Sequence, residues 1–503
     1  VSIRETEVLD RSSWYLAAFV QDDWTVTSNL TINAGVRWET DTPIVDANDR
    51  MNGFDPNAIN PVSGTPGVVR FMGVDGWPTS PYETDWNNFG PRLGFAWRPL
   101  GAERTVVRGG AGVFFAHPFD HGAPSSASLG FEQSATLSTP DNGLTAPFFL
   151  RDGVPPLEAS AAARDASFGA VPVGRPTTTA VTFFERDRKT GVSRQFNLGV
   201  QQELGARVVV EAAYVGNVSR NLAGPDLSIN QIAPERLRPG VTQRDRPFPQ
   251  FSNVSLVLPA NGRSDYHAAV VRAEKRFSGG FNALATYTYS RFLSDTDSGG
   301  SDVGDVGTYS NLYDRAADYG PAGNDIRHRL TLSSVYELPI GPERRYLSSH
   351  WLGHLIGGWT IGVLGTIQSG PPFTVTTQTN TTNAFSAGAL RADVTGDPEL
   401  PSSERTLTRW FNTDAFAQPA PFTFGNSGRG ILRGNGVVSF DLSLAKNVPV
   451  GAARTLQLRV EAFNAFNHAN FGLPGHTFGA PNFGVVSSAG EGRTIQLGAR
   501  FVY

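Results

Sequence analysis

Two pairs of histidines in this chain of 503 residues have a spacing at which metal ligands often occur. The pairs are His117 with His121 and His350 with His354. Ligands four residues apart meet on one side only in a helix, and Pro118 argues against a helix at the first pair. The second pair could lie on a short amphipathic turn, but no third ligand accompanies it. We therefore expect no zinc site.

Four aspartates lie close together in a segment rich in glycine and serine, namely Asp295, Asp297, Asp302 and Asp305. Carboxylate oxygens are ligands that calcium prefers. The spacing is not that of an EF-hand loop, and the glutamate that closes such a loop is missing. The sequence leaves calcium binding open as an alternative and favours a solvated loop.

Motifs of catalysis and of phosphate binding are absent. The segment 425–428, Gly-Asn-Ser-Gly, has the wrong spacing for a nucleophile elbow. Gly428, Gly430 and Gly434 do not fit the dinucleotide fingerprint, so a glycine turn is expected there. The absence of cysteine excludes thiolate nucleophiles, thiolate metal sites and disulfides. We expect no catalytic residue, no cofactor and no enzymatic activity.

The charge balance excludes nucleic acid as a partner. The chain has 42 basic and 46 acidic residues, a net charge of -4, and no basic run. The 55 glycines and 34 prolines indicate strands and loops, because both residues weaken helix interiors. No stretch approaches the length of a membrane-spanning helix. The first residues lack a signal peptide, and the chain does not begin with Met, so we expect a mature product or a fragment.

The elements that must position any site are strands, because apolar and polar residues alternate repeatedly. In 30–38, the residues Leu30, Ile32, Ala34, Val36 and Trp38 share one face. The other alternating segments are 196–204, 208–214, 281–289, 330–338, 359–367, 440–444, 456–462 and 493–503. Segments of about ten residues have the length of a tilted strand that crosses a bilayer.

The connections between these strands alternate between short and long. Short turns are expected at 27–29, 100–104, 205–206, 278–280 and 449–453, with an intermediate link at 339–358. Long, structureless connections are expected at 41–87, 116–193, 218–264, 294–326, 369–436 and 467–492. This pattern is typical of an antiparallel transmembrane barrel with short periplasmic turns and long extracellular loops.

The count predicts about 13 strands, of which the first and the last run toward the periplasm. Such barrels usually close on an even number of strands, so we expect a barrel that is incomplete on its N-terminal side. Aromatic residues near strand ends could form interfacial girdles; they are Trp14, Trp24, Trp38, Trp97, Trp359, Phe466 and Tyr503. The alternative is a secreted β-sandwich or propeller, which would have shorter strands and loops.

Several motifs occur in a specific order along the chain: Ala18-Phe19-Val20-Gln21-Asp22-Asp23-Trp24, the strand 30–39, Phe89-Gly90-Pro91-Arg92-Leu93-Gly94-Phe95-Ala96-Trp97, Asp325-Ile326-Arg327-His328-Arg329-Leu330 and Glu461-Ala462-Phe463-Asn464-Ala465-Phe466-Asn467-His468. As a set they resemble the C-terminal barrel of TonB-dependent outer-membrane receptors, especially the Oar-like group, over nearly all of residues 1–503. The resemblance implies a 22-strand barrel occluded by a plug, which imports a scarce ligand with energy from the TonB complex. The chain would supply the last 13 strands, and the plug and TonB box have no counterpart in it.

The resemblance places the chain in the Gram-negative outer membrane, with an unknown extracellular ligand, the membrane lipid and, through the missing plug region, the TonB complex as partners. The long loops 116–193 and 369–436 are the best candidate binding regions. Polar residues on the inward face could line a transport path, although they more often pair with one another or contact the plug. They are Arg37, Glu39, Arg92, Arg459, Glu461 and Arg500.

The last strand, 493–503, resembles the signal by which the outer-membrane assembly machinery recognises its clients. Ile495, Leu497, Ala499, Phe501 and Tyr503 would face lipid, whereas Thr494, Gln496, Gly498 and Arg500 would face inward. We expect this strand to present an unpaired edge, because its neighbour in the full barrel is missing.

Three functions follow as hypotheses. The first is a TonB-dependent receptor or transporter, the second a plug-free barrel for adhesion or assembly, and the third a secreted β-rich hydrolase. The sequence does not rank siderophores, glycans, peptides or protein export as the cargo.

Overall fold

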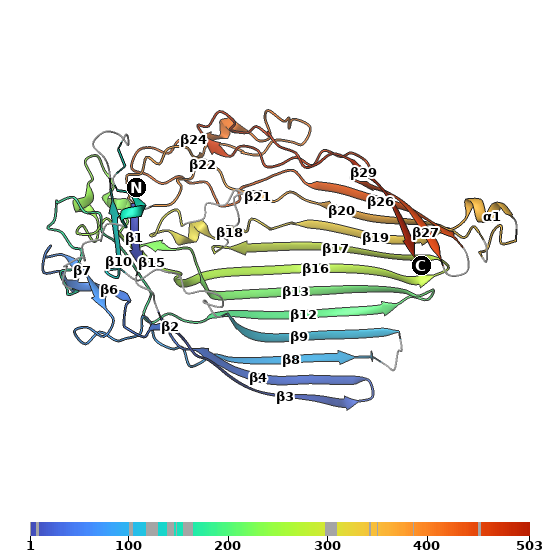
Figure 1. The fold of residues 1–503 in the computed structure, drawn as a ribbon, viewed down its shortest axis with the longest axis horizontal. Coiled ribbons are helices and arrows are strands. Elements are labelled where there is room, and N and C mark those ends of the chain that lie inside the picture. Colours follow the sequence, from blue (N-terminus) through green and yellow to red (C-terminus); the bar gives the residue numbers. More distant parts are fainter. Residues whose placement is uncertain are drawn as a thin grey trace.

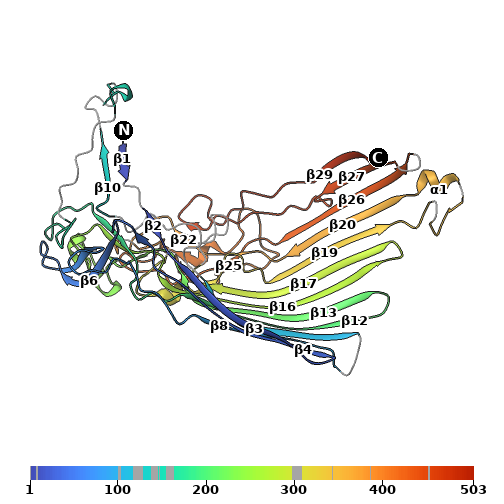
Figure 2. The ribbon, with the colours of Figure 1, turned by 60° about the horizontal axis from the view of Figure 1, so that its bottom comes forward.

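The computed structural model describes the chain except residues 1, 7–9, 100–103, 117–128, 138–144, 147, 154–163, 297–308, 342–343, 350, 386, 451–453 and 503. Its main feature is one large antiparallel sheet whose strands lie side by side (Figure 1). The sheet is curved rather than flat (Figure 2). This is the all-β, antiparallel architecture that the alternation predicts.

Thirteen strands of the described chain follow one another along the path of the sheet. In chain order they are β3 (Tyr15–Thr27), β4 (Leu30–Asp41), β8 (Phe89–Trp97), β9 (Thr105–Ala116), β12 (Gly191–Glu203), β13 (Val208–Ala223), β16 (Ala260–Ser278), β17 (Phe281–Ser294), β19 (His328–Glu337), β20 (Trp359–Gln368), β26 (Val437–Pro449), β27 (Thr455–Phe463) and β29 (Thr494–Val502). A short strand, β18 (Gly320–Pro321), pairs with the end of β17. The 13 strands on this path agree with the predicted count of about 13, and β18 brings the described sheet to 14 strands.

Cross-strand register keeps the two kinds of side chain apart. Between β27 and β29, Val460 lies opposite Leu497, whereas Glu461 lies opposite Gln496. The same parity runs from strand to strand, so the sheet has an apolar face, which carries Leu497, and a polar face, which carries Gln496. A slip by one residue would exchange the faces, so the pattern fixes the register.

The predicted faces agree with this register. The six charged residues expected to face inward all lie on the polar face. Of the predicted aromatic girdle, Trp24, Trp38, Trp97 and Trp359 lie on the apolar face near strand ends. Trp14 precedes β3, Phe466 follows β27, and Tyr503 lies outside the described residues.

One end of the sheet is closed by short turns. The turn between β16 and β17 has positive φ angles at Gly279 and Gly280. A side chain at Gly280 would also approach the carbonyl oxygen of Glu337 to 2.8 Å, so glycine meets both the backbone and the packing requirement. The turns expected at 100–104 and 449–453 lie partly outside the described residues.

The long connections at the other end are not structureless, which corrects the prediction. Together with the segment before β3, they form small sheets and 3-10 helices that gather beyond that end (Figure 1). The small strands are β1 (Ser2–Thr6) with β10 (Glu132–Thr136), β2 (Arg11–Ser12) with β5 (Val45–Asp46), β6 (Asn52–Ile59) with β7 (Pro66–Phe71), β11 (Ala180–Phe183) with β15 (Asn253–Leu256) and β14 (Leu227–Ser228), β21 (Pro372–Phe373) with β25 (Leu432–Arg433), β22 (Thr376–Thr377) with β28 (Thr477–Phe478), and β23 (Asp393–Val394) with β24 (Phe416–Ala417). The 3-10 helices are Leu150–Asp152, Pro234–Arg236, Gln243–Asp245, Arg315–Asp318 and Thr413–Ala415.

We call these connections together the cap, and the buried cores of the described chain lie in it. One cluster of aromatic and aliphatic residues joins three connections: Phe54, Val69, Phe71, Phe131, Val181, Phe183, Phe248, Phe251 and Val254. A second is built mainly from 369–436: Phe373, Val375, Ala392, Phe411, Ala415, Phe416 and Leu432. A third contains Met51, Met72, Tyr82, Phe184 and Val257. These long-range contacts give the cap a folded structure of its own.

A short helix, α1 (Trp351–Ile356), lies in the link between β19 and β20, at the end with the short turns. None of the helices in the described part of the chain is long and apolar enough to cross a membrane.

The two outermost strands of the sheet are β3 and β29. Each pairs with one neighbour, and among the described residues no pairing joins one to the other. The described residues of β29 are all exposed. The unpaired edge predicted for the last strand is therefore present.

Candidate functional site

A hollow on the polar face lies where five strands pass through two adjacent rows. In the first row the order is Gln21, Gly35, Arg92, Gly112 and Gln195. In the second row the order is Asn33, Gly94, Gly110 and Asn197. Each row thus places glycines between polar residues, and the missing side chains leave a depression.

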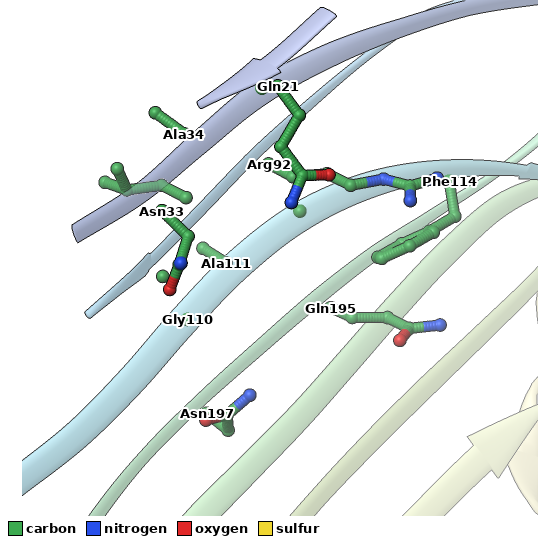
Figure 3. A pocket seen from close by; sticks show the side chains of 13 residues that line it. Gln21, Asn33, Ala34, Arg92, Gly110, Ala111, Phe114, Gln195 and Asn197 are labelled. Carbon is green, nitrogen blue, oxygen red and sulfur yellow. The ribbon is translucent and has the colours of Figure 1, made fainter. Parts of the chain in front are cut away.

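The depression has a volume of about 270 Å³. Gln21 on β3 and Gln195 on β12 complete its sides, and Figure 3 shows these amides and Arg92 around it. The guanidinium carbon of Arg92 lies 4.6 Å from the ring centroid of Phe114, which is a cation–π contact. We call this site the glycine-floored hollow.

The glycines of the hollow differ in how closely an added side chain would approach its neighbours. A Cβ at Gly112 would come within 3.0 Å of the Phe114 ring, so this glycine leaves room for the Arg92 contact. A Cβ at Gly110 would meet the carbonyl oxygen of Leu93 at 3.3 Å and the amide nitrogen of Asn197 at 3.7 Å. A side chain at position 110 therefore requires the Leu93 carbonyl oxygen to move by a few tenths of an ångström, and it would fill the hollow.

A second hollow of about 350 Å³ lies on the same face, across β17, β19, β20 and β26. Hydroxyl groups and one carboxylate line it together with leucines: Leu284, Thr331, Ser333, Leu364, Thr366, Ser439 and Asp441. The two hollows differ in chemistry, since the first offers amides and a cation and the second offers hydroxyls and an acid. Both can bind polar, hydrogen-bonding groups.

The cap contains a buried charged network that joins two of its connections. Arg391 pairs with Asp318, and both side chains are only 3% exposed. The Ser310 hydroxyl donates to the same carboxylate at 3.0 Å, and Arg429 donates to the Asp318 carbonyl oxygen at 3.2 Å. The network ties the connection before β19 to the connection between β20 and β26.

The motif that begins at Asp325 makes a second set of buried contacts. The Asp325 carboxylate is fully buried and accepts a hydrogen bond from the backbone N–H of Phe292 at 2.7 Å. It also pairs with Arg327 at 3.1 Å and with Arg433 from the next connection. The motif therefore fixes the start of β19 against β17 and the cap.

The motif that begins at Glu461 lies at the end of β27, and its asparagines also make positioning hydrogen bonds. The side-chain amide of Asn464 donates to the carbonyl oxygens of His468 at 2.9 Å and Glu491 at 3.2 Å. The side chain of Asn467 accepts from the backbone N–H of Arg493 at 2.9 Å, immediately before β29. These bonds position the last strand.

A third hollow, of about 240 Å³, lies in the cap. It is lined by polar groups of three connections, including Asp226, Gln231, Asn253 and Tyr309. Burial raises the pKa of Tyr309 to about 12, so its hydroxyl remains a neutral hydrogen-bonding group. Of the two predicted binding loops, 369–436 contributes backbone to this hollow through Ala387 and Gly388.

The structure resolves some of the other candidate residues. Asp295 is buried and pairs with Arg263 and Arg315, each at 3.5 Å. The other aspartates of that segment, the first histidine pair and His350 lie outside the described residues, as does the side chain of His354. A Cβ at Gly425 would clash with the Arg391 carbonyl oxygen, and Gly430 has a φ of +60°, as a glycine turn requires. Within the described ranges no group of three or more His, Cys, Asp or Glu could hold a metal.

Sequence reasoning missed the two hollows on the polar face and the Asp318 network. A signal for the first was available, because Gly94, Gly110 and Gly112 fall on inward-facing positions of two neighbouring strands. The partners Asp318 and Arg391 are 73 residues apart, and no local pattern links them.

Comparison with known proteins gives one family match. A family model described as an outer membrane beta barrel domain matches residues 2–496. No curated protein matches the chain in sequence.

Solved structures with similarity include the FrpB iron transporter from Neisseria meningitidis, at 12% identity and a TM-score of 0.43, covering 97% of this chain and 45% of that one. The outer membrane transporter YddB from Escherichia coli has 11% identity and a TM-score of 0.45, with 97% of this chain and 54% of that one covered. The chain thus spans about half the length of these structures.

Proposed function

The chain belongs to the family of outer membrane beta barrel domains, and from this premise we propose that it forms the wall of a TonB-dependent receptor or transporter of the Oar-like group. Its place is the Gram-negative outer membrane, and the family is one of membrane barrels rather than enzymes. The proposal concerns what the barrel does: it takes up a scarce ligand with energy from the inner membrane.

The observation that carries the proposal is the division of the sheet into two faces. The apolar face exposes residues such as Leu497 and Leu458, as a lipid-covered surface requires. The polar face carries charged residues and the two hollows, which is what the wall of a transport path would offer to a passing polar ligand.

We further propose that these 13 strands are the C-terminal part of a 22-strand barrel. The unpaired, exposed edges of β3 and β29 support this, because in a membrane every backbone polar group must find a partner. The missing strands would pair there, and a plug would fill the space against the polar face. During insertion, the assembly machinery would recognise β29 through Ile495, Leu497 and Phe501.

The first experiment compares uptake with and without energy from TonB. Strains that lack this gene, TonB or both are grown on limiting ferric siderophores, oligosaccharides or peptides. We expect one nutrient for which both single deletions reduce growth and the double deletion adds nothing further. A growth defect of the gene deletion that persists unchanged without TonB would contradict the proposal and favour a plug-free barrel for adhesion or assembly.

The second experiment tests the glycine-floored hollow in the full-length protein. Gly110→Leu fills the hollow, whereas Val107→Leu places the same side chain on the apolar face of the same strand, away from the residues that line the hollow. We expect the first variant to lower uptake of the identified nutrient several-fold, with an unchanged amount of protein at the surface, and the second to have wild-type uptake. Equal uptake by both variants would remove the hollow from the transport path.

A further inference from the structure

The link between β19 and β20 carries a helix, whereas the connections at the same end of the sheet that are fully described are tight turns. Short turns of outer-membrane barrels face the periplasm, so α1 lies at the periplasmic end (Figure 1). The link is folded: the backbone N–H of Gly341 donates to the Tyr346 carbonyl oxygen at 3.0 Å, and that of Gly358 to Ile340 at 3.3 Å.

One contact establishes the side of the sheet on which α1 lies. Lys446 is on the apolar face of β26, directly opposite Trp359 of β20. Its ammonium nitrogen lies 5.1 Å from the ring centroid of Trp359 and donates a hydrogen bond to the carbonyl oxygen of Leu355. The C-terminal end of α1 therefore approaches the outward, lipid-facing side of the barrel wall.

The helix turns its small residues toward the rest of the link. A Cβ at Gly353 would meet the Leu347 carbonyl oxygen at 2.2 Å, and a Cβ at Gly357 would meet the Gly341 Cα at 2.4 Å. Backbone thus packs directly on backbone at these glycines. The link also carries three large apolar side chains, Trp351, Leu355 and Ile356.

Those large side chains are apolar and exposed. Trp351 is 68% exposed, Leu355 61% and Ile356 45%, and the nearby Tyr346 is exposed as well. Trp359 lies on the same side of the same end, and Trp and Tyr are enriched where a membrane meets water. Arg345 flanks the patch, with its guanidinium carbon 5.5 Å from the Tyr346 ring centroid, whereas Arg344 pairs at 2.8 Å with Glu337, which belongs to the polar face.

We propose that α1 is an interfacial anchor, and that its partner is the phospholipid of the periplasmic leaflet of the outer membrane. Trp351, Leu355 and Ile356 insert at the boundary between head groups and acyl chains, while Lys446 and Arg345 reach the head groups. A short helix beside the barrel wall would thereby fix the depth of the barrel in the bilayer. The inference depends on the outer-membrane location and not on the transport proposal.

The absence of cysteine makes a direct test possible. Single cysteines are introduced as Leu355→Cys on α1, Leu458→Cys on the apolar face, and Asn447→Cys on the polar face beside Lys446. The full-length protein is spin-labelled in vesicles of phosphatidylethanolamine and phosphatidylglycerol, and collisions with oxygen and with a water-soluble nickel complex are compared.

We expect the label at 355 to resemble that at 458, with an oxygen-to-nickel collision ratio several-fold above that at 447. A ratio at 355 equal to that at 447 would place α1 in water and overturn the proposal. Quenching by brominated lipid gives a second readout, because Trp351→Phe should remove part of the tryptophan quenching of the unlabelled protein. No difference in quenching between this variant and the wild type would likewise count against the anchor.

Discussion

Large apolar side chains are buried in the cap but exposed on one face of the sheet. In the cap, Phe251 is fully buried and packs against Phe54. In the sheet, Leu497 of β29 is 76% exposed, although it belongs to one of the most regular apolar patterns of the chain. Two regions of one chain thus show opposite relations between hydrophobicity and burial.

The difference follows from the two solvents that the regions meet. The cap lies in water, so it must bury apolar surface within itself to fold. The sheet lies in the bilayer, where lipid covers the apolar face and the backbone must satisfy its hydrogen bonds between strands. Exposure in the protein alone is therefore not a defect of the sheet, and mutations of similar chemistry should have different consequences in the two regions.

The largest contrast is expected for loss of an apolar side chain. Phe251→Ala removes a ring from the cap core and should destabilise the cap by about 3–5 kcal/mol. Leu497→Ala, in β29, should cost less, because lipid refills the space. Thermal unfolding in vesicles, with limited proteolysis to report the cap separately, measures both. Equal destabilisation by the two variants would contradict the proposed difference between cap and sheet.

The second largest contrast is expected between a buried charge pair of the cap and a partly exposed charge pair of the sheet. Arg391→Met leaves Asp318 buried without its main cation and should destabilise the cap by about 3 kcal/mol. In the sheet, Arg459 pairs with Glu461 at 3.3 Å with both side chains partly exposed, and Arg459→Met should cost under about 1 kcal/mol.

A double variant separates the buried charge from simple loss of packing. Arg391→Met combined with Asp318→Leu removes both charges and should recover much of the lost stability, as chemical unfolding of the cap would show. A double variant as unstable as Arg391→Met alone would mean that packing, and not the unpaired carboxylate, causes the loss.

The two faces of a single strand give a smaller contrast. Leu442 and Ser443 are neighbours near the middle of β26, on the apolar and the polar face respectively. Leu442→Arg places a charge in lipid and should lower the free energy of unfolding in vesicles by about 2–3 kcal/mol. Ser443→Arg adds the same side chain to the polar face and should cost under about 1 kcal/mol. The reverse order would mean that the faces are assigned wrongly.

The sheet was predictable because its information is local. Alternation in each segment identifies strand and face at once, and the 13 strands follow from it. Boundaries were less certain: the prediction stopped at 444, whereas β26 continues to Pro449, because Lys446 interrupts the apolar pattern. That lysine lies on the apolar face near the periplasmic end, where its ammonium can reach the interface.

The cap and the sites were less predictable because their contacts are not local. Phe54 meets Phe251 across nearly 200 residues of chain, and no periodicity indicates such a contact. Asp325 was identified through its motif, but its bond to the backbone of Phe292 and its pairing with Arg433 appear only in three dimensions. The glycines of the hollow stood in the predicted strands, yet their common position depends on the register between β8 and β9.

The smallest expected effect concerns the junction of sheet and cap, at Asp46. Burial alone would raise the pKa of this carboxyl, but hydrogen bonds from Arg50 and from the backbone N–H groups of Asn48 and Asp10 outweigh it and lower the pKa. A depressed folded-state pKa gives stability that is present above the unfolded value of about 3.9 and is lost as pH falls through the folded value. Cap stability should therefore decline below about pH 4, and Asp46→Asn should flatten that decline while lowering stability at neutral pH. Thermal unfolding at a series of pH values measures this decline. If cap stability falls with pH as steeply in Asp46→Asn as in the wild type, other carboxyls cause the acid sensitivity. The junction would then not contribute to the difference between cap and sheet.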